Sequence, residues 1–346
     1  MRSLSCGLII VALAAVVGCS TDSTTSTKTD EIVLVTYESF ALPEKAAAEF
    51  TRQTGTKIRV IKSGDAAEML TKALLTSGSP EGDVIFGIDN TLATRAIDSD
   101  LLSPVDVAVS KEIDDRFGVG NGNKTLVPID HGEVCLNYDA AWFTEHELDA
   151  PKTLEDLADE RYKGLTVMPS PVTSSPGLAM LVGTVASFGD EGWVQYWQRL
   201  KANDVLVRPS WSDAYYGDYT VSGGNRPIVV SYASSPPAEV VFSEGKRTEP
   251  VSEVATGTCV EQVEYAGVLR GTKNAQMAER LLEFMVSSPW QQELPLTNFV
   301  YPVIDVELPE EFQRWAPPVD EPLTLPAAQI NANREAWVER WREIME

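Results

Sequence analysis

The chain has 346 residues, which suggests two domains, and its 43% hydrophobic and 23% charged residues are typical of a globular protein rather than a disordered one. It carries 51 acidic residues against 28 Lys plus Arg, which gives a formal net charge of -23. Because so acidic a surface repels phosphate backbones, we expect no nucleic-acid partner, and the 2 His residues leave little material for a His-rich metal site.

The first residues have the pattern of an export signal. Arg2 precedes an apolar run that is too short for a membrane span. The run ends in Val16-Val17-Gly18-Cys19, which resembles the lipobox of bacterial lipoproteins, where the Cys is lipid-modified and becomes the first mature residue. We therefore expect a signal peptide over residues 1–18 and a lipid-anchored flexible tether over residues 19–30. A plain signal peptide cleaved nearby is the alternative.

Strand and helix patterns alternate after the tether. Strands are predicted at 32–35, 57–61 and 83–88, and helices at 43–50 and from Asp65 to near Gly78. Pro43 fits the first turn of one helix and Gly55 its end, while Asp65 and Glu68 have capping-box spacing at the start of the next. This alternation predicts an α/β layer with a mostly parallel sheet.

The middle and end of the chain predict a second α/β unit followed by further elements. Strands are predicted at 127–138, 164–168, 205–207, 228–232 and 260–269, and helices at 153–158, 176–187, 191–201, 274–286 and 327–344. Because no second linker separates the two units, we expect interleaved domains between which the chain crosses more than once. The cleft between two facing sheets is then the natural ligand site.

The sequence lacks the common catalytic motifs G-x-S-x-G, H-E-x-x-H and G-x-x-x-x-G-K-[ST]. Asp130 and His131 are compatible with a base and its orienting group, as in a hydrolase, although local hydrogen bonding at a strand end is the simpler interpretation. Tyr215 and Tyr216 are compatible with ferric-ion binding through phenolates. Neither pair decides the function.

Several short segments spread along the chain carry a resemblance to one family. They are Y-E-S-F at 37–40, G-I-D-N at 87–90, V-P-I-D-H-G at 127–132, T-S-S-P-G-L at 173–178, W-S-D-A-Y at 211–215, S-Y-A-S-S-P at 231–236 and N-F-V-Y-P at 298–302. In this order and at this spacing they resemble the substrate-binding proteins of bacterial ABC importers. Within that periplasmic-binding-protein type II superfamily they are similar to the thiamine-binding proteins.

The resemblance implies a two-lobed α/β fold with two hinge crossings and an interlobe ligand cleft. One lobe would comprise residues 31–130 and 261–346, and the other residues 131–260, with the crossings near Cys135 and Cys259. Because the two crossings of such a hinge run side by side, we expect a Cys135–Cys259 disulfide if the two Cα atoms lie about 4.4–6.8 Å apart. Two buried free thiols are the alternative.

The resemblance also implies a ligand site by matching position. Its residues are Tyr37, Asp65, Ala66, Ser174, Ser175, Trp211, Tyr232, Ala233, Ser234, Ser235, Pro236 and Phe299. The aromatic rings would surround the cationic thiazolium of thiamine. Asp65 would complement the charge or accept from the amino group, and the Ser hydroxyls and free N–H groups would bind the hydroxyl or phosphate end.

Some of these residues have a structural interpretation as well. Asp65 fits a helix N-cap, and Trp211 is compatible with a core position although it lies in a polar run. Phe299 stands where the family can show Trp, so it offers less stacking area and no indole N–H. Ala66 stands where the family shows Gly, which makes a close backbone contact less favourable there.

The function implied is an extracytoplasmic lipoprotein that captures thiamine, or its mono- or diphosphate, and delivers it to an ABC permease and, through it, an ATPase. The resemblance implies a monomer with no catalytic residues, no metal and no cofactor. It would be held at the outer face of the cytoplasmic membrane by its N-terminal lipid only. A ferric-ion or polyamine-binding protein of the same superfamily is the alternative, and an exported hydrolase using Asp130 and His131 is the less favoured one.

Overall fold

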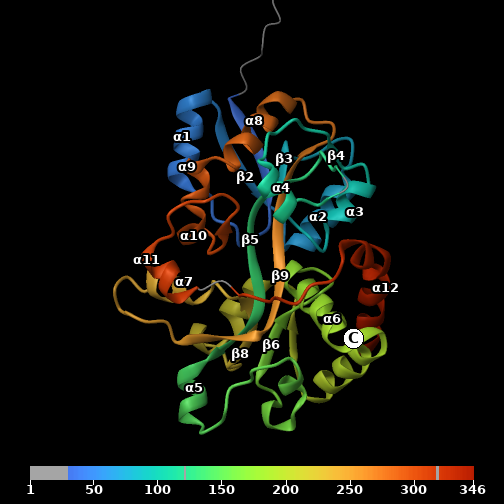
Figure 1. Ribbon diagram of the computed structural model, residues 1–346, viewed down its shortest axis with the longest axis vertical. Helices are drawn as coiled ribbons and strands as arrows, with labels where there is room; N and C mark the ends of the chain where they lie inside the picture. The colour runs from blue at the N-terminus through green and yellow to red at the C-terminus, as the bar shows by residue number, and fades with distance from the viewer. Residues whose placement is uncertain (1–29, 121, 317–318) are drawn as a thin grey trace, which may run out of the picture.

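The computed structural model describes residues 30–120, 122–316 and 319–346, so the expected signal peptide and Cys19 lie outside the described residues. The described chain forms one mixed sheet with helices packed on it (Figure 1). The strand order is β2-β1-β3-β9-β5-β8-β6-β7, with β10 beside β5 and β4 beside β9. In these ranges no helix is both long enough and apolar enough to cross a membrane.

The elements have the following bounds. The strands are β1 (Glu31–Thr36), β2 (Lys57–Lys62), β3 (Val84–Asp89), β4 (Leu102–Ser103), β5 (Val127–Asp139), β6 (Thr166–Pro169), β7 (Leu206–Arg208), β8 (Ile228–Tyr232), β9 (Ser252–Leu269) and β10 (Tyr301–Pro302). The α-helices are α1 (Glu44–Thr54), α2 (Ala66–Leu75), α3 (Ala93–Asp98), α4 (Lys111–Phe117), α5 (Ala140–Glu145), α6 (Ser175–Ala202), α7 (Pro236–Val241), α8 (Ala275–Met285), α9 (Ser288–Gln291), α10 (Leu294–Thr297), α11 (Glu310–Trp315) and α12 (Ala327–Met345). Short helical turns are η1 (Glu155–Ala158), η2 (Glu160–Tyr162), η3 (Asp213–Asp218) and η4 (Thr220–Ser222).

The first half-sheet consists of β2, β1 and β3, and β1 is parallel to both of its neighbours. Alternating strand and helix patterns produce it, as the sequence predicts. Pro43 is the N-cap of α1, and Gly55 ends that helix with φ 75°, a left-handed conformation that glycine adopts without steric cost. Phe50 of α1 is buried in a core with Ile32 and Leu34 of β1. This packing places the carboxyl ends of β1 and β3 at the edge that faces the second half of the molecule.

The second half-sheet consists of β8, β6 and β7, and β6 is parallel to both neighbours. Its core contains the long helix α6, which the sequence predicts as two helices at 176–187 and 191–201. The two predicted segments form one element that is kinked at Gly189, where φ is 69°. The helix predicted at 153–158 is only the short turn η1. Helices α3, α4, α5, α7, α9, α10 and α11 were not predicted, and all except α4 are six residues or shorter.

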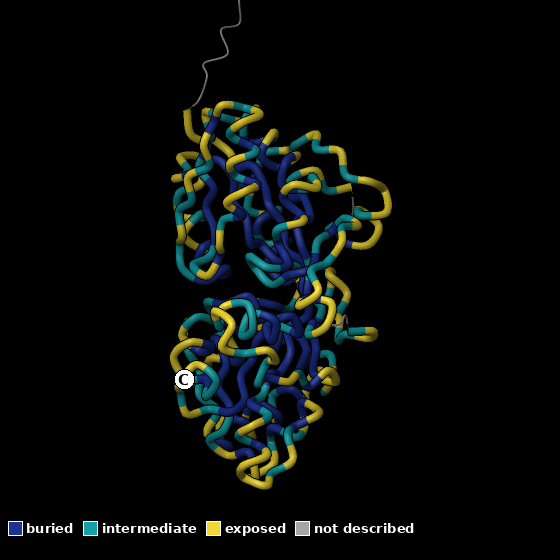
Figure 2. The backbone as a smooth tube through the Cα atoms, turned by 90° about the vertical axis from the view of Figure 1, so that its left-hand side faces the viewer, coloured by how far each residue is buried: buried dark blue, intermediate teal, exposed yellow. Residues whose placement is uncertain are grey.

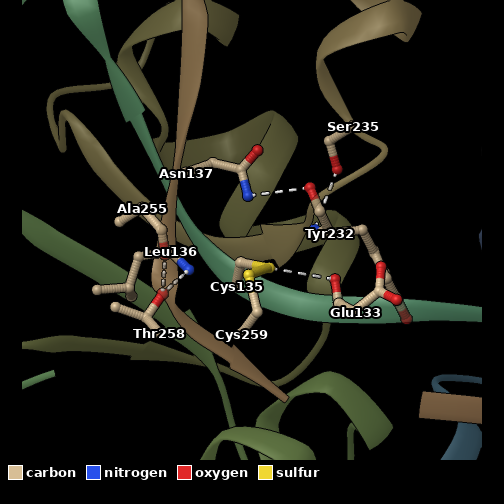
Figure 3. Close-up of a disulfide and its surroundings, with 9 residues drawn as sticks. All are labelled: Glu133, Cys135, Leu136, Asn137, Tyr232, Ser235, Ala255, Thr258 and Cys259. Carbon is tan, nitrogen blue, oxygen red and sulfur yellow. Dashed lines mark hydrogen bonds between the residues drawn. A yellow bond between two sulfur atoms is a disulfide. The ribbon is translucent and has the colours of Figure 1, made fainter. Parts of the chain in front are cut away.

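Two long antiparallel strands, β5 and β9, run from one half of the molecule to the other (Figure 1). Seen from the side, the chain forms two bodies whose connecting backbone is largely buried (Figure 2). The expected disulfide joins these strands: the Sγ atoms of Cys135 and Cys259 are 2.03 Å apart and their Cα atoms 4.2 Å apart, slightly less than the range used for the prediction. Figure 3 shows it beside the hydrogen bond that the Leu136 N–H donates to Thr258 Oγ1.

The C-terminal helix α12 packs on α6 of the second half, at the lower right of Figure 1. Trp341 of α12 and Trp197 of α6 are both almost completely buried, with ring centroids 5.7 Å apart in an edge-to-face arrangement. The sequence interpretation placed residues 261–346 together in the first lobe. In the structure α12 packs on α6, which belongs to the other predicted lobe, residues 131–260. The apolar face of α12 is covered by these contacts.

Candidate functional site

A cavity of about 160 Å³ lies where the two halves face each other. Its walls come from the ends of β1, β7 and β8, the starts of α2 and α6, the turn η3, β9, and helices α7 and α10 with the segments that follow them. The residues that line it are Tyr37, Ser39, Ala41, Asp65, Ser175, Pro176, Trp211, Tyr215, Tyr216, Tyr232, Ser235, Ala238, Phe242, Glu264, Thr297, Asn298, Phe299 and Val300. Because both halves contribute, the cavity is complete only in this arrangement of the two.

One wall is a stack of aromatic rings from the second half. Trp211 stacks on Tyr215, with centroids 4.9 Å apart and planes 23° apart, and Tyr216 meets it edge-on at 5.4 Å. The Trp211 indole Nε1 donates to Ser231 Oγ at 2.9 Å, which fixes the orientation of the ring. The Tyr232 ring centroid lies 6.4 Å from that of Trp211. The arrangement offers aromatic faces to a ligand, and such faces attract cations.

The opposite wall contains Tyr37 and Phe299. Tyr37 follows β1 and packs on Phe86, with ring centroids 5.9 Å apart, and its hydroxyl donates to Glu264 Oε2 at 3.2 Å. Phe299 lies in a left-handed backbone conformation, with φ 56°, and meets Phe242 edge-on at 5.3 Å. The backbone turn after α10 therefore brings this ring to the cavity, where the sequence interpretation expected it.

Three carboxyl groups from neighbouring strands lie in a row, and one of them, Glu264, lines the cavity. Glu264 of β9 is the register partner of Asp89 of β3 on one side and of Asp130 of β5 on the other. Like charges directly opposite each other in a sheet repel. Among the described residues none of the three has an ion pair, and the buried Asp130 and Glu264 carboxyl groups lie within hydrogen-bond reach of each other.

Burial and mutual repulsion raise the pKa values of this acidic row. Burial, followed by the nearby Asp89 charge, raises the pKa of Glu264 to about 8. Burial and the Glu264 charge raise the pKa of Asp130 well above its usual value. Burial also raises the pKa of Asp89 to about 6, although Thr91, Gln262 and Leu92 donate hydrogen bonds to it. A cation entering the cavity would favour the ionised forms and so would be attracted.

Asp65 joins the two halves directly. Its Oδ1 accepts from the Ala66 N–H at 2.6 Å at the start of α2, and its Oδ2 accepts from the Trp211 N–H at 2.9 Å. The helix-capping interpretation of Asp65 is therefore confirmed, with Trp211 as a second partner from the other half. Burial raises the pKa of this carboxyl against the lowering effect of its two backbone donors. Both of its oxygens are occupied by protein donors in this arrangement.

The structure brings together about half of the expected ligand residues at the cavity surface. Those that line it are Tyr37, Asp65, Ser175, Trp211, Tyr232, Ser235 and Phe299. The others, which are Ala66, Ser174, Ala233, Ser234 and Pro236, are buried behind the wall. Ser234 Oγ donates to the Phe299 carbonyl, so this hydroxyl supports the aromatic wall instead of facing the cavity. The Ser174 side chain is buried beside the Asp65 carboxyl, whose pKa its hydroxyl helps to lower.

Sequence reasoning missed several lining residues, among them Glu264 and Phe242. It weighed Tyr215 and Tyr216 as iron ligands, although Tyr215 also belongs to the W-S-D-A-Y segment of the thiamine resemblance. Glu264 had one usable signal, an acidic residue inside the apolar strand 260–269. In the structure the phenol of Tyr215 is buried and stacked on Trp211, and burial raises the pKa values of both phenols. No group of three or more His, Cys, Asp or Glu residues placed to hold a metal ion occurs in the described part of the chain.

The Asp130–His131 pair does not form a base and its orienting group. Successive residues of β5 point to opposite faces, so Asp130 faces Glu264 while the His131 ring stacks between Phe117 at 4.5 Å and Tyr301 at 5.4 Å. Burial lowers the pKa of His131 to about 4. The imidazole of His131 is held by aromatic stacking rather than by the local hydrogen bonds that the sequence interpretation expected.

The fold and the cavity together define a two-lobed ligand-binding protein of the periplasmic-binding-protein type II class. The chain belongs to the family of bacterial extracellular solute-binding proteins, whose family model matches residues 79–320. A solved periplasmic thiamin binding protein shares the fold with a TM-score of 0.80 and 26% sequence identity, over 93% of this chain and 98% of that one.

Relatives of similar length carry the same description. The chain is 31% identical over 320 residues to the thiamine-binding periplasmic protein of Salmonella typhimurium, covering 91% of this chain and 93% of the relative. It is 29% identical over 324 residues to that of Escherichia coli, with the same coverage. A ferric binding protein from Campylobacter jejuni has a TM-score of 0.71 at 18% identity over 90% of this chain and 99% of that one, which is a likeness of fold alone.

Proposed function

We propose that this protein captures thiamine, or its mono- or diphosphate, in the aromatic cavity and delivers it to an ABC permease without catalysing a reaction. The observation that carries the proposal is the combination of aromatic rings from both halves with the Glu264 carboxyl in one cavity. The thiazolium nitrogen of thiamine has no hydrogen to donate, so the cation is best held by ring faces, each contributing ~0.5–2 kcal/mol, and by a nearby carboxylate.

We propose that the two halves act as lobes that close on the ligand. Besides the Asp65–Trp211 hydrogen bond, the Glu68 N–H donates to the Thr173 carbonyl at 3.1 Å across the same gap. The lobes would be residues 31–130 with the chain from 261 to about β10, and residues 131–260 with α12, because α12 packs on α6. A ligand that touches both sides adds contacts only in the closed form and so shifts the population toward it.

The delivery part of the proposal concerns the N-terminus. Cys19 would carry the lipid, and the polar tether up to residue 30 would give the domain reach from the outer face of the membrane toward the permease and its ATPase. The protein would work as a monomer. Replacing Cys19 with Ala should abolish the covalent attachment of labelled fatty acid to the protein; labelling that persists in the variant would contradict the anchor.

The experiment that tests ligand capture is calorimetric titration of the purified protein with thiamine and its two phosphates. Trp211→Ala should weaken binding at least tenfold, about 1.4 kcal/mol or more, because it removes one face of the cation site but keeps the backbone N–H that Asp65 accepts. Trp142→Ala is the matched control, since that ring stacks on His146 and does not line the cavity. Binding of ferric ion or spermidine in preference to thiamine would support the alternative solutes.

A further inference from the structure

A second cavity, of about 410 Å³, lies on another side of the junction between the two halves. It is bounded by Glu68 and Thr71 of α2, by Arg95 of α3, by residues 171–173, and by the face of α12 that carries Arg334. In Figure 1 these helices lie together on the right flank, with α2 and α3 above α12. None of its lining residues lines the aromatic cavity.

Arg334 is the unusual residue of this second cavity. It is 7% exposed, and its Nε is buried without a hydrogen-bond partner. Its contact with a carboxylate is weak, because Nη2 lies 3.5 Å from Glu335 Oε1 and the Glu335 side chain is 85% exposed. A buried guanidinium that lacks its full set of acceptors is costly, so a cavity beside it is a natural place for an acceptor.

Arg95 adds a second positive charge to the same cavity. Its Nη1 donates to Thr71 Oγ1 at 3.1 Å, and within the described ranges no carboxylate lies at ion-pair distance from it. Burial, followed by the Arg95 charge, lowers the pKa of Arg334. Two guanidinium groups therefore repel each other across a cavity in a protein whose net charge is -23.

The other carboxylates of this cavity already have cationic partners. Glu68 is paired with Lys72 at 2.7 Å on α2. Glu339 is paired with Arg342 at 3.9 Å on α12. Neither carboxylate is within ion-pair distance of Arg95 or Arg334. Arg95 thus has no ion pair among the described residues, and the one ion pair of Arg334 is a 3.5 Å contact with the exposed Glu335 carboxylate.

We propose that a small inorganic oxyanion of the phosphate type binds between Arg95 and Arg334. The planar guanidinium fork matches two oxygens of such an anion and forms charge-assisted hydrogen bonds with them. Arg95 belongs to the first half, whereas Arg334 belongs to α12, which packs on the second half. An anion held by both would therefore tie the two halves together and favour the closed arrangement of the cavity on the other side.

The test is titration of the full chain with sodium phosphate, against sodium chloride of equal ionic strength, with thermal unfolding and calorimetry as readouts. We expect saturable binding of phosphate and a rise in Tm that chloride does not reproduce. Arg95→Gln should weaken phosphate binding at least tenfold. Arg340→Gln is the matched control, because this Arg lies on α12 and pairs with Glu343 at 2.5 Å outside the cavity.

A second variant covers Arg334 itself. Arg334→Lys keeps the charge but loses the fork, so it should also bind phosphate more weakly; if this variant does not fold, the Arg95→Gln result decides alone. No stabilisation beyond that of chloride, or equal phosphate affinity in wild type and Arg95→Gln, would overturn the proposal. Neither result bears on thiamine capture, because the titration uses phosphate alone.

Discussion

The carboxylate of Asp65 and the backbone N–H of Trp211 form a 2.9 Å hydrogen bond between residues that are 146 positions apart in the sequence. The same carboxylate holds the first N–H of α2, so one side chain connects the start of a helix in one half to the aromatic wall of the other. One buried carboxylate therefore contacts both halves of the molecule beside the cavity.

Removing one acceptor oxygen from the Asp65 carboxylate should weaken its contact with Trp211 while leaving its contact with the start of α2. Asp65→Asn keeps an oxygen for α2 but places an amide where Trp211 donates, so the closed form loses one hydrogen bond worth ~0.5–1.5 kcal/mol and gains two facing donors. We expect thiamine affinity to fall by at least about 2–13-fold in calorimetric titration, which is the factor that the lost hydrogen bond alone corresponds to. Asp139→Asn is the control, since Asp139 caps α5 and accepts from Thr220 within the second half. An equal loss of affinity in both variants would mean that the effect is general destabilisation.

The backbone at Gly87 should be essential for the position of Tyr37. Gly87 has φ 103°, and a Cβ there would lie 2.2 Å from Tyr37 Cδ1. Gly87→Ala must therefore displace the ring or shift β3, and we expect at least tenfold weaker thiamine binding together with a loss of unfolding free energy of ~1–3 kcal/mol. Gly217→Ala, where no atom lies within 4 Å of the added Cβ, should change neither quantity. Wild-type affinity in Gly87→Ala would contradict this role.

Ligand binding should depend on pH through Glu264. Because its pKa is about 8 in the free protein, the carboxyl is mostly protonated at pH 6.5, and a bound cation would favour its ionised form. Binding then releases a proton, so affinity should increase between pH 6.5 and 8, by at most tenfold per pH unit. Titration in buffers of different ionisation enthalpy measures the proton release directly. Glu264→Gln should abolish both the release and the pH dependence; a pH-independent wild type would contradict the assignment.

The raised pKa of Glu264 should also make the stability of the folded protein depend on pH. A carboxyl whose folded pKa is raised contributes its stability fully below the unfolded value of about 4.5 and loses it as the pH rises through about 8. The ligand-free protein should therefore become less stable to urea between pH 6.5 and 8, and Glu264→Gln should reduce that loss. The contribution of His131 changes with pH in the opposite direction, because its pKa in the folded protein is lowered to about 4. The stability that the neutral imidazole contributes is lost as the pH falls below about 6.5. Measurements above pH 6.5 keep the two effects apart.

The Cys135–Cys259 disulfide should stabilise the protein without being needed for binding. It closes a loop with a sequence separation of 124 residues between two strands that also share a hydrogen-bonded ladder. The double replacement of both Cys residues by Ser should lower the free energy of unfolding by ~2–4 kcal/mol in urea titration. Thiamine affinity should stay within twofold, because the cavity walls do not include either Cys. A large loss of affinity would mean that the bond itself sets the geometry of the hinge.

The sequence determined much of the local structure, whereas the membership of the site could be predicted only in part. Apolar strands, the Pro43 and Gly55 helix limits, and the N-cap at Asp65 depend on neighbours in the chain, so their patterns could be interpreted directly. The aromatic residues of the cavity and the disulfide came from resemblance, since no local pattern places Tyr37 near Trp211 or Cys135 near Cys259. The short helices α9, α10 and α11 escaped prediction because they are too short to show a period.

Only the tertiary structure decided which carboxyl group lines the cavity and which acidic side chains lie opposite each other on neighbouring strands. Glu264 becomes part of an acidic row because the antiparallel register of β9 places it between Asp89 and Asp130, and register is a relation between strands that no single segment encodes. The second cavity exists for the same reason. Arg95 and Arg334 are far apart in the sequence, and α12 brings them to one site by packing its apolar face on α6.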